Sequence, residues 1–119
     1  MVSFPSTKEL SKGQVRDLRT GHRSKILSVA WSASGTKLAS GSYDHTAKVF
    51  SLGECALANI RDAVGVDLKG HSADVDQVKW HPTDDFGLAT TSADKTVKVW
   101  DVRAPAKPSA TVQTTGRKY

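Results

Sequence analysis

Two stretches of the chain carry short apolar runs that are separated by turn-forming residues, a pattern typical of β-strands rather than helices. The runs cover residues 25–31, 36–42 and 46–50 in the first stretch and 75–80, 86–92 and 96–101 in the second. Gly35, Asp44 and Pro82 lie between runs, where turns and breaks in pairing are expected. No window shows an apolar period of 3.6 residues. The pattern therefore predicts an all-β protein.

The first run has apolar residues on both of its predicted faces. Because side chains alternate along a strand, one predicted face carries Ile26, Ser28 and Ala30. The other predicted face carries Leu27, Val29 and Trp31. A strand that is apolar on both faces is usually covered on both. We therefore expect run 25–31 to be buried from two sides.

The two stretches are copies of one unit. Gly21-His22 recurs as Gly70-His71 and Trp31 recurs as Trp80, in each case 49 residues later. From Leu38 onward the spacing to the second copy is 50 residues. A repeat of this length predicts two similar supersecondary units. The fourth strand of each unit is predicted at 64–68 and 110–114, with an enlarged loop at 51–65.

The order Gly-His, Trp, Ser/Thr-x-Ser-x-Asp and a closing Trp-Asp resembles the WD40 family. The second copy ends in Trp100-Asp101, whereas the first has Phe50-Ser51 at that place. The resemblance implies two four-stranded antiparallel β-propeller blades that do not close into a ring. It also implies this organisation: a basic N-terminal segment at 1–20, one repeat at 21–69, a second repeat at 70–114, and a tail at 115–119.

Two blades are fewer than a closed propeller needs. Closure removes the exposed edges of the sheets, and stacked repeats usually require about three copies for stability. We therefore expect the chain to be a fragment of a longer protein or the product of an incomplete gene model.

The WD40 resemblance assigns a polar relay to each blade. In the second copy it comprises His71, Thr90, Asp94 and Trp100, and in the first it is a partial set of His22, Ser40 and Asp44. A buried carboxylate needs a donor such as an imidazole N–H, and an indole N–H needs an acceptor such as a hydroxyl. Because Phe50 has no donor, we expect the first blade to be the less rigid.

No residue pattern indicates catalysis, a metal or a cofactor. A Ser-His-Asp triad is disfavoured because the same set occurs once in each copy. The histidines and Cys55 lack metal-ligand spacing, and the glycines are too dispersed for a phosphate loop. His81 is expected in an exposed turn and Cys55 in a loop. The sequence therefore predicts a protein that is not an enzyme and binds neither a small-molecule substrate nor a membrane.

Basic charge is concentrated at the two ends of the chain. Residues 1–25 carry six basic residues against two acidic ones, and residues 103–119 carry four basic residues and no acid. Direct RNA binding through these ends is one alternative function, although no aromatic stacking platform accompanies them. Turn residues are the candidate contacts for a protein partner: Tyr43, His45, Asp84 and Asp85. Phe86 is expected to be buried at a strand start.

The finer details resemble one branch of the WD40 family, the subunits of the THO complex. The segment Val75-Asp76-Gln77 followed by Trp80, and Asp101-Val102-Arg103, are less general than the repeat signature itself. The resemblance implies a scaffold that binds other THO/TREX subunits in the nucleus and acts in mRNA export coupled to transcription. An adaptor of another assembly, such as a ubiquitin ligase or a chromatin complex, is the alternative.

Overall fold

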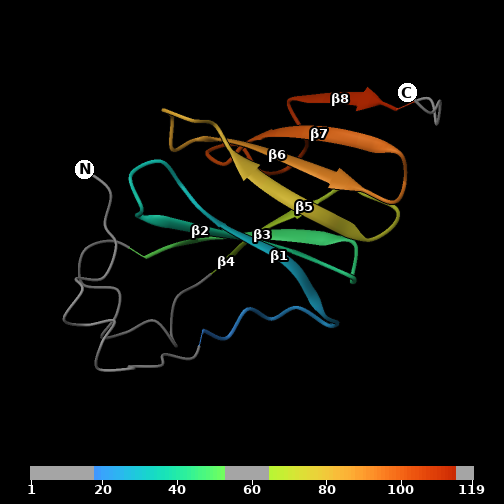
Figure 1. The fold of residues 1–119 in the computed structure, drawn as a ribbon, viewed down its shortest axis with the longest axis horizontal. Helices are drawn as coiled ribbons and strands as arrows, with labels where there is room; N and C mark the ends of the chain where they lie inside the picture. Colours follow the sequence, from blue (N-terminus) through green and yellow to red (C-terminus); the bar gives the residue numbers. More distant parts are fainter. Residues whose placement is uncertain (1–17, 53–64, 115–119) are drawn as a thin grey trace.

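Two four-stranded antiparallel sheets make up the part of the chain that the computed structural model describes, residues 18–52 and 65–114 (Figure 1). The first sheet contains β1 (Ile26–Trp31), β2 (Lys37–Ser42), β3 (Thr46–Ser51) and β4 (Gly65–Lys69), in that order. The second sheet contains β5 (Val75–Trp80), β6 (Gly87–Ser92), β7 (Thr96–Asp101) and β8 (Ala110–Gln113). These residues include no helix that could cross a membrane. The all-β fold with two unclosed sheets is confirmed.

The strand bounds agree with the predicted runs to within one residue at each described end. Residue 64, predicted to begin the fourth strand, lies outside the described residues, as do most of the predicted loop at 51–65 and Cys55. Most of the basic segment 1–20 and the tail 115–119 also lie outside them.

A β-bulge in β1 changes which residues share a face. Ile26 pairs with Ser42 and Ser28 pairs with Gly41, so Leu27 is the extra residue on β1. An extra residue reverses the alternation on its N-terminal side. Ile26 therefore lies on the face of Val29 and Trp31, and the prediction that it shares a face with Ser28 and Ala30 was wrong. The second sheet has the same irregularity between Val75 and Gln77.

The core lies between the two sheets, where β5 packs across one face of the first sheet. This face, here called the inner face of the first sheet, presents small buried residues: Ala39, Ala47 and Val49. The second sheet places Val78, Trp80, Leu88 and Trp100 against them. The indole N–H of Trp80 also donates a hydrogen bond to the carbonyl oxygen of Ala30, at 2.9 Å.

A polar clamp joins the sheets at the end where β1 turns into β2. The carboxylate of Asp85, in the turn before β6, accepts hydrogen bonds from the backbone N–H of Ser34 at 3.0 Å and from its hydroxyl. The sheets are thus fixed by apolar packing along β5 and by this clamp at one end.

Gly41 is the point of closest approach between the sheets. A Cβ atom at this position would lie 2.8 Å from Cγ1 of Val75 and 3.0 Å from the carbonyl oxygen of Val75. Since backbone atoms cannot move aside cheaply, only glycine allows β5 to sit this near to β2.

The opposite face of the first sheet, called its outer face, is exposed along β1, whereas Ser40, Ser42 and Phe50 on the same face are buried. Val29 is 61% exposed and Trp31 is 40% exposed, whereas their repeat equivalents Val78 and Trp80 are 6% and 7% exposed. The expectation that run 25–31 is buried from two sides was therefore wrong. The physical reason is that, among the described strands, only those of the second sheet pack on β1, and they cover its other face.

The close approach at Gly41 yields a stability prediction. We expect Gly41→Ala to lower the free energy of unfolding by about 1–3 kcal/mol, because the added methyl group overpacks against Val75. Thr91→Ala, at the repeat-equivalent position in the second sheet, is the matched control and should change it by less than about 0.5 kcal/mol. Urea unfolding of the three proteins measures both values, and equal effects of the two substitutions would contradict the packing account.

Candidate functional site

A chain of hydrogen bonds runs through the second sheet from an indole to a carboxylate. The indole N–H of Trp100 donates to the hydroxyl of Thr90 at 2.9 Å, and that hydroxyl lies 2.7 Å from Nε2 of His71. Nδ1 of His71 lies 2.9 Å from the carboxylate of Asp94. We assign the Nδ1–H tautomer, because a carboxylate can only accept and the Thr90 hydroxyl then donates to Nε2. The structure thus brings together all four residues that the sequence grouped.

Two further residues complete this relay, and the sequence reasoning did not include them. Thr96 donates to Asp94 from its hydroxyl at 2.5 Å and from its backbone N–H at 2.9 Å. The hydroxyl of Ser92 accepts the backbone N–H of Asp94 at 3.1 Å. Both have repeat equivalents, Thr46 and Ser42, at a spacing of 50 residues. That recurrence was the available signal for a shared structural role.

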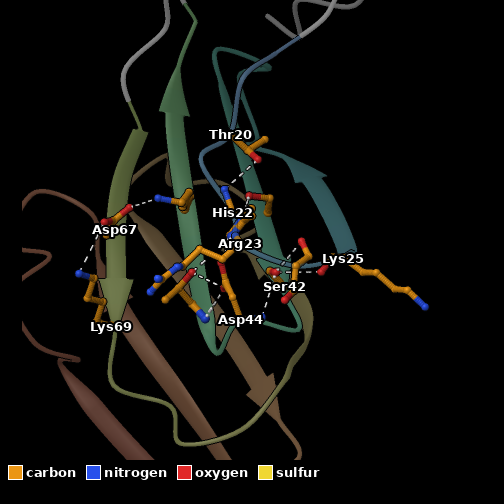
Figure 2. Close-up of polar contacts among 12 residues, drawn as sticks. Thr20, His22, Arg23, Lys25, Ser42, Asp44, Asp67 and Lys69 are labelled. Atoms are coloured by element: carbon orange, nitrogen blue, oxygen red, sulfur yellow. Dashed lines mark hydrogen bonds and ion pairs between the residues drawn. The ribbon is translucent and has the colours of Figure 1, made fainter.

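The first sheet has the same relay without its indole (Figure 2). Nδ1 of His22 lies 3.0 Å from the carboxylate of Asp44, and Nε2 lies 2.7 Å from the hydroxyl of Ser40. The backbone N–H of Arg23 donates to the same carboxylate at 2.9 Å. Phe50 is buried where Trp100 stands in the second sheet and donates nothing. The structure therefore brings together the partial set as well.

Hydrogen bonding holds both relay carboxylates in their charged form. Burial alone would raise the pKa of Asp94, but hydrogen bonds from Thr96, His71 and Ser72 outweigh it and keep the pKa well below its ordinary value. The pKa of Asp44 is lowered for the same reason: burial would raise it, but hydrogen bonds from Thr46, Arg23 and His22 outweigh the effect of burial. Charged Asp44 and Asp94 are therefore part of the folded state.

The relays are unsuited to nucleophilic chemistry. Ser40 and Thr90, the only hydroxyls placed on the imidazole Nε2 atoms among the described residues, are 2% and 0% exposed. A buried hydroxyl cannot reach a substrate carbonyl. Nor do the described residues contain three His, Cys, Asp or Glu side chains grouped as metal ligands. The relays are therefore structural elements in our interpretation.

The candidate partner contacts lie at opposite ends of the strands. Tyr43 and His45 are in the turn between β2 and β3, whereas Asp84 and Asp85 are in the turn between β5 and β6. The Asp85–Ser34 clamp places the latter turn beside the turn between β1 and β2, at the other end of β2. The structure does not bring the four residues into one site.

The turn between β2 and β3 presents side chains to solvent. Tyr43 is 53% exposed, and His45 is also exposed, with a left-handed φ of 75°. Asp44 fixes this turn from beneath, since its carboxylate accepts the backbone N–H of Thr46 at 3.0 Å. The relay of the first sheet therefore supports an exposed aromatic and an exposed imidazole on an ordered turn.

The turn between β5 and β6 is largely occupied by contacts within the chain. Asp85 clamps Ser34, and Asp84 accepts the backbone N–H of Phe86 at 2.7 Å. The guanidinium of Arg103 lies 4.3 Å from the centre of the Phe86 ring and pairs with Asp101. Phe86 is 38% exposed, so its predicted burial was wrong. A cation, rather than the core, covers the ring. His81 lies in an exposed turn as predicted.

The chain matches the family described as WD domain, G-beta repeat, at residues 13–51 and 63–101. Because the two matches cover more than half of the chain, it belongs to the WD40 family.

Several known proteins are similar to this chain. THO complex subunit 3 from Arabidopsis thaliana is 44% identical over 84 residues, which are 71% of this chain and 26% of that protein. The Poly(A)+ RNA export protein of Schizosaccharomyces pombe is 39% identical over 102 residues, 82% of this chain and 26% of that protein. WD repeat-containing protein AAC3 of Dictyostelium discoideum is 31% identical over 99 residues, 70% of this chain and 20% of that protein. The chain thus spans about a quarter or less of the length of these relatives.

A substitution that keeps an aromatic ring at residue 100 tests the hydrogen bond that the Trp100 indole donates to Thr90. We expect Trp100→Phe, which copies the arrangement at Phe50, to lower the free energy of unfolding by about 1–3 kcal/mol through the lost hydrogen bond to Thr90 and a smaller ring. Trp31→Phe, on the exposed outer face, should cost less than about 0.5 kcal/mol. Denaturant unfolding measures the free energy of unfolding of both variants. An equal loss in Trp100→Phe and Trp31→Phe would contradict a stabilising role of the relay hydrogen bond.

The lowered pKa values predict a loss of stability in acid. A carboxylate whose folded pKa lies below its unfolded value near 3.8 stabilises the fold above that pH, and this contribution is lost as the pH falls toward the folded pKa. We therefore expect the free energy of unfolding to fall steeply below about pH 4. Asp94→Asn should reduce this acid-dependent loss, because it removes one of the two relay carboxylates with a lowered pKa. A pH series of thermal unfolding measures the slopes, and an unchanged slope in Asp94→Asn would contradict the assignment.

Proposed function

We propose that this chain supplies two blades of a WD40 scaffold that binds other subunits of a THO-type complex in the nucleus and acts in mRNA export. The observation that carries the proposal is the 44% identity to THO complex subunit 3 across 71% of the chain. A second relative, named for poly(A)+ RNA export, supports the same process. In this function the chain binds proteins and contacts RNA only indirectly.

The turn between β2 and β3 is the partner contact that we favour. Tyr43 offers a large exposed ring with a polar tip, the residue type enriched at the energetic centres of interfaces. Asp44, tied to His22 and Arg23, holds the turn in one conformation before binding. A pre-ordered turn loses little conformational entropy when a partner docks. The turn between β5 and β6 is less suited, since Asp85 is engaged with Ser34.

Affinity purification tests the complex and the contact together. A tagged copy of the chain is expressed in cells with an intact THO complex, and co-purifying proteins are quantified by mass spectrometry. We expect THO subunits to be enriched. The double variant Tyr43→Ala/His45→Asn should reduce their recovery about tenfold or more, because truncating a central Tyr costs about 2 kcal/mol of binding. Asn is chosen at residue 45 because it tolerates a left-handed φ.

Asp84→Ala, at the other end of the strands, is the matched control and should retain the THO subunits. Consistent absence of THO subunits, with subunits of a ubiquitin ligase or chromatin complex in their place, would overturn the proposed function in favour of an adaptor role elsewhere. Full recovery with the Tyr43→Ala/His45→Asn variant would leave the complex standing and refute the assigned contact.

A further inference from the structure

Two segments of the first sheet meet at its relay end, which is the end where β2 turns into β3 (Figure 2). The backbone N–H of Tyr43 donates to the carbonyl oxygen of Lys25 at 2.9 Å, so this turn is tied to the residue that precedes β1. The backbone N–H of Arg23 donates to the carboxylate of Asp44 at 2.9 Å. Arg23, Lys25, Tyr43 and His45 are all exposed. The relay end of the first sheet therefore presents these four side chains together.

The chemistry of this end is basic and apolar. Among the ion pairs of the described residues, none involves Arg23 or Lys25. Leu27, the extra residue of the bulge, is 40% exposed, and Tyr43 is 53% exposed. Asp44 is the one acid between residues 18 and 46, and its side chain is only 8% exposed. An incoming group at this end thus meets two cations and two apolar surfaces.

The second copy of the repeat keeps the backbone of this end and changes its side chains. The backbone N–H of Ala93 donates to the carbonyl oxygen of Asp74 at 3.0 Å, just as that of Tyr43 donates to Lys25. The relay end of the second sheet therefore carries two acids, one base and no aromatic ring. The positions of Arg23, Lys25, Leu27, Tyr43 and His45 are taken there by Ser72, Asp74, Asp76, Ala93 and Lys95.

The second sheet also shows that this end stays open when the neighbouring face is covered. Val75 is fully buried against the first sheet, yet Asp76 and Lys95 remain exposed. Their repeat equivalents, Leu27 and His45, thus stand outside the surface that packing between sheets covers. The relay end of the first sheet is therefore available to a different kind of partner.

The acids of the second sheet border the basic end of the first. A Cβ atom on Gly41 would lie 2.8 Å from Cγ1 of Val75, so these two residues are in close contact. Gly41 lies two residues before Tyr43, and Val75 lies between Asp74 and Asp76. A long polyanion such as RNA, laid across both ends, would meet like charge at the second sheet. A short acidic segment with an apolar side chain fits the first end alone.

We propose that the relay end of the first sheet binds a short acidic segment of a partner protein. Its carboxylates pair with Arg23 and Lys25, and an adjacent apolar side chain packs on Leu27 and Tyr43. The acids of the second sheet repel the carboxylates of a segment that shifts toward them, and this repulsion fixes where the segment lies. The inference rests on the proposed function in one respect, the use of the turn between β2 and β3 as the partner contact.

Selection from a library of random peptides displayed on phage tests this chemistry without a known partner. The natural chain is immobilised and used for the selection, and Arg23→Glu/Lys25→Glu is used in parallel. The matched control is Lys79→Glu/Lys107→Glu, which makes the same change of charge near the other end of the strands. Circular dichroism verifies that each variant is folded.

We expect the natural chain and the control to select peptides that combine Asp or Glu with a large apolar residue. R23E/K25E should select peptides that carry Lys or Arg instead. A selected acidic peptide, labelled with fluorescein and followed by anisotropy, should bind R23E/K25E at least about tenfold more weakly, because each attraction becomes a like-charge contact. If R23E/K25E does not fold, R23Q/K25Q replaces it and should lose the acidic preference without gaining a basic one.

Three results would overturn the proposal. If the natural chain selects no peptides, or peptides without an excess of acidic residues, this end does not recognise carboxylates. If R23E/K25E keeps the acidic preference, the binding surface lies elsewhere. If an oligonucleotide of uridines binds through Arg23 and Lys25 while acidic peptides do not, the partner is RNA.

These outcomes are separate from the affinity purification that tests the proposed function. Recovery of THO subunits without selection of acidic peptides would leave the complex standing and refute the acidic segment. Selection of acidic peptides without recovery of THO subunits would keep the assigned chemistry and place the chain in another assembly.

Discussion

A sheet that is apolar on both faces must be covered on both, and the rest of this structure depends on that constraint. The chain meets it once, where Val78 and Trp80 of β5 pack on the small residues of the first sheet. Gly41 sets how near the sheets come, and the bond from Trp80 to the Ala30 carbonyl fixes their register. The two faces turned away from this contact have no described strand packed on them, and they keep exposed apolar residues such as Val29 and Val112.

Each relay lies within one sheet and ties its segments together independently of the contacts between the sheets. His71 and Asp94 link the segment that precedes β5 to the turn between β6 and β7. In the same way, His22 and Asp44 link the segment that precedes β1 to the turn between β2 and β3. Because charged groups with little exposure are costly unless hydrogen-bonded, these contacts favour one turn geometry over others. Through Asp44, the buried relay of the first sheet positions the exposed Tyr43 that we assign to partner binding.

Sequence periodicity and the repeat predicted the strands. The WD40 resemblance implied the two four-stranded sheets and the grouping of His71, Thr90, Asp94 and Trp100, but not the further relay residues Ser92 and Thr96. They did not predict that one face of β1 is exposed, because the apolar pattern of Val29 and Trp31 indicates what a residue can pack against and not whether a partner is present. The bulge at Leu27 was missed because it leaves the spacing between Gly-His and Trp unchanged in both copies. The burial predicted for Phe86 was wrong because the residue that covers its ring is Arg103, which follows β7 and is not a neighbour in sequence.

The hydrogen-exchange rates of the indole N–H protons of Trp31, Trp80 and Trp100 test most directly which faces of the sheets are covered and which are exposed. The indoles of Trp80 and Trp100 are hydrogen-bonded and buried, whereas Trp31 is exposed. Hydrogen exchange followed by NMR should therefore show strong protection at Trp80 and Trp100 and rapid exchange at Trp31. Rapid exchange at Trp80 in the folded chain, or protection of Trp31 equal to that of Trp80, would contradict the account.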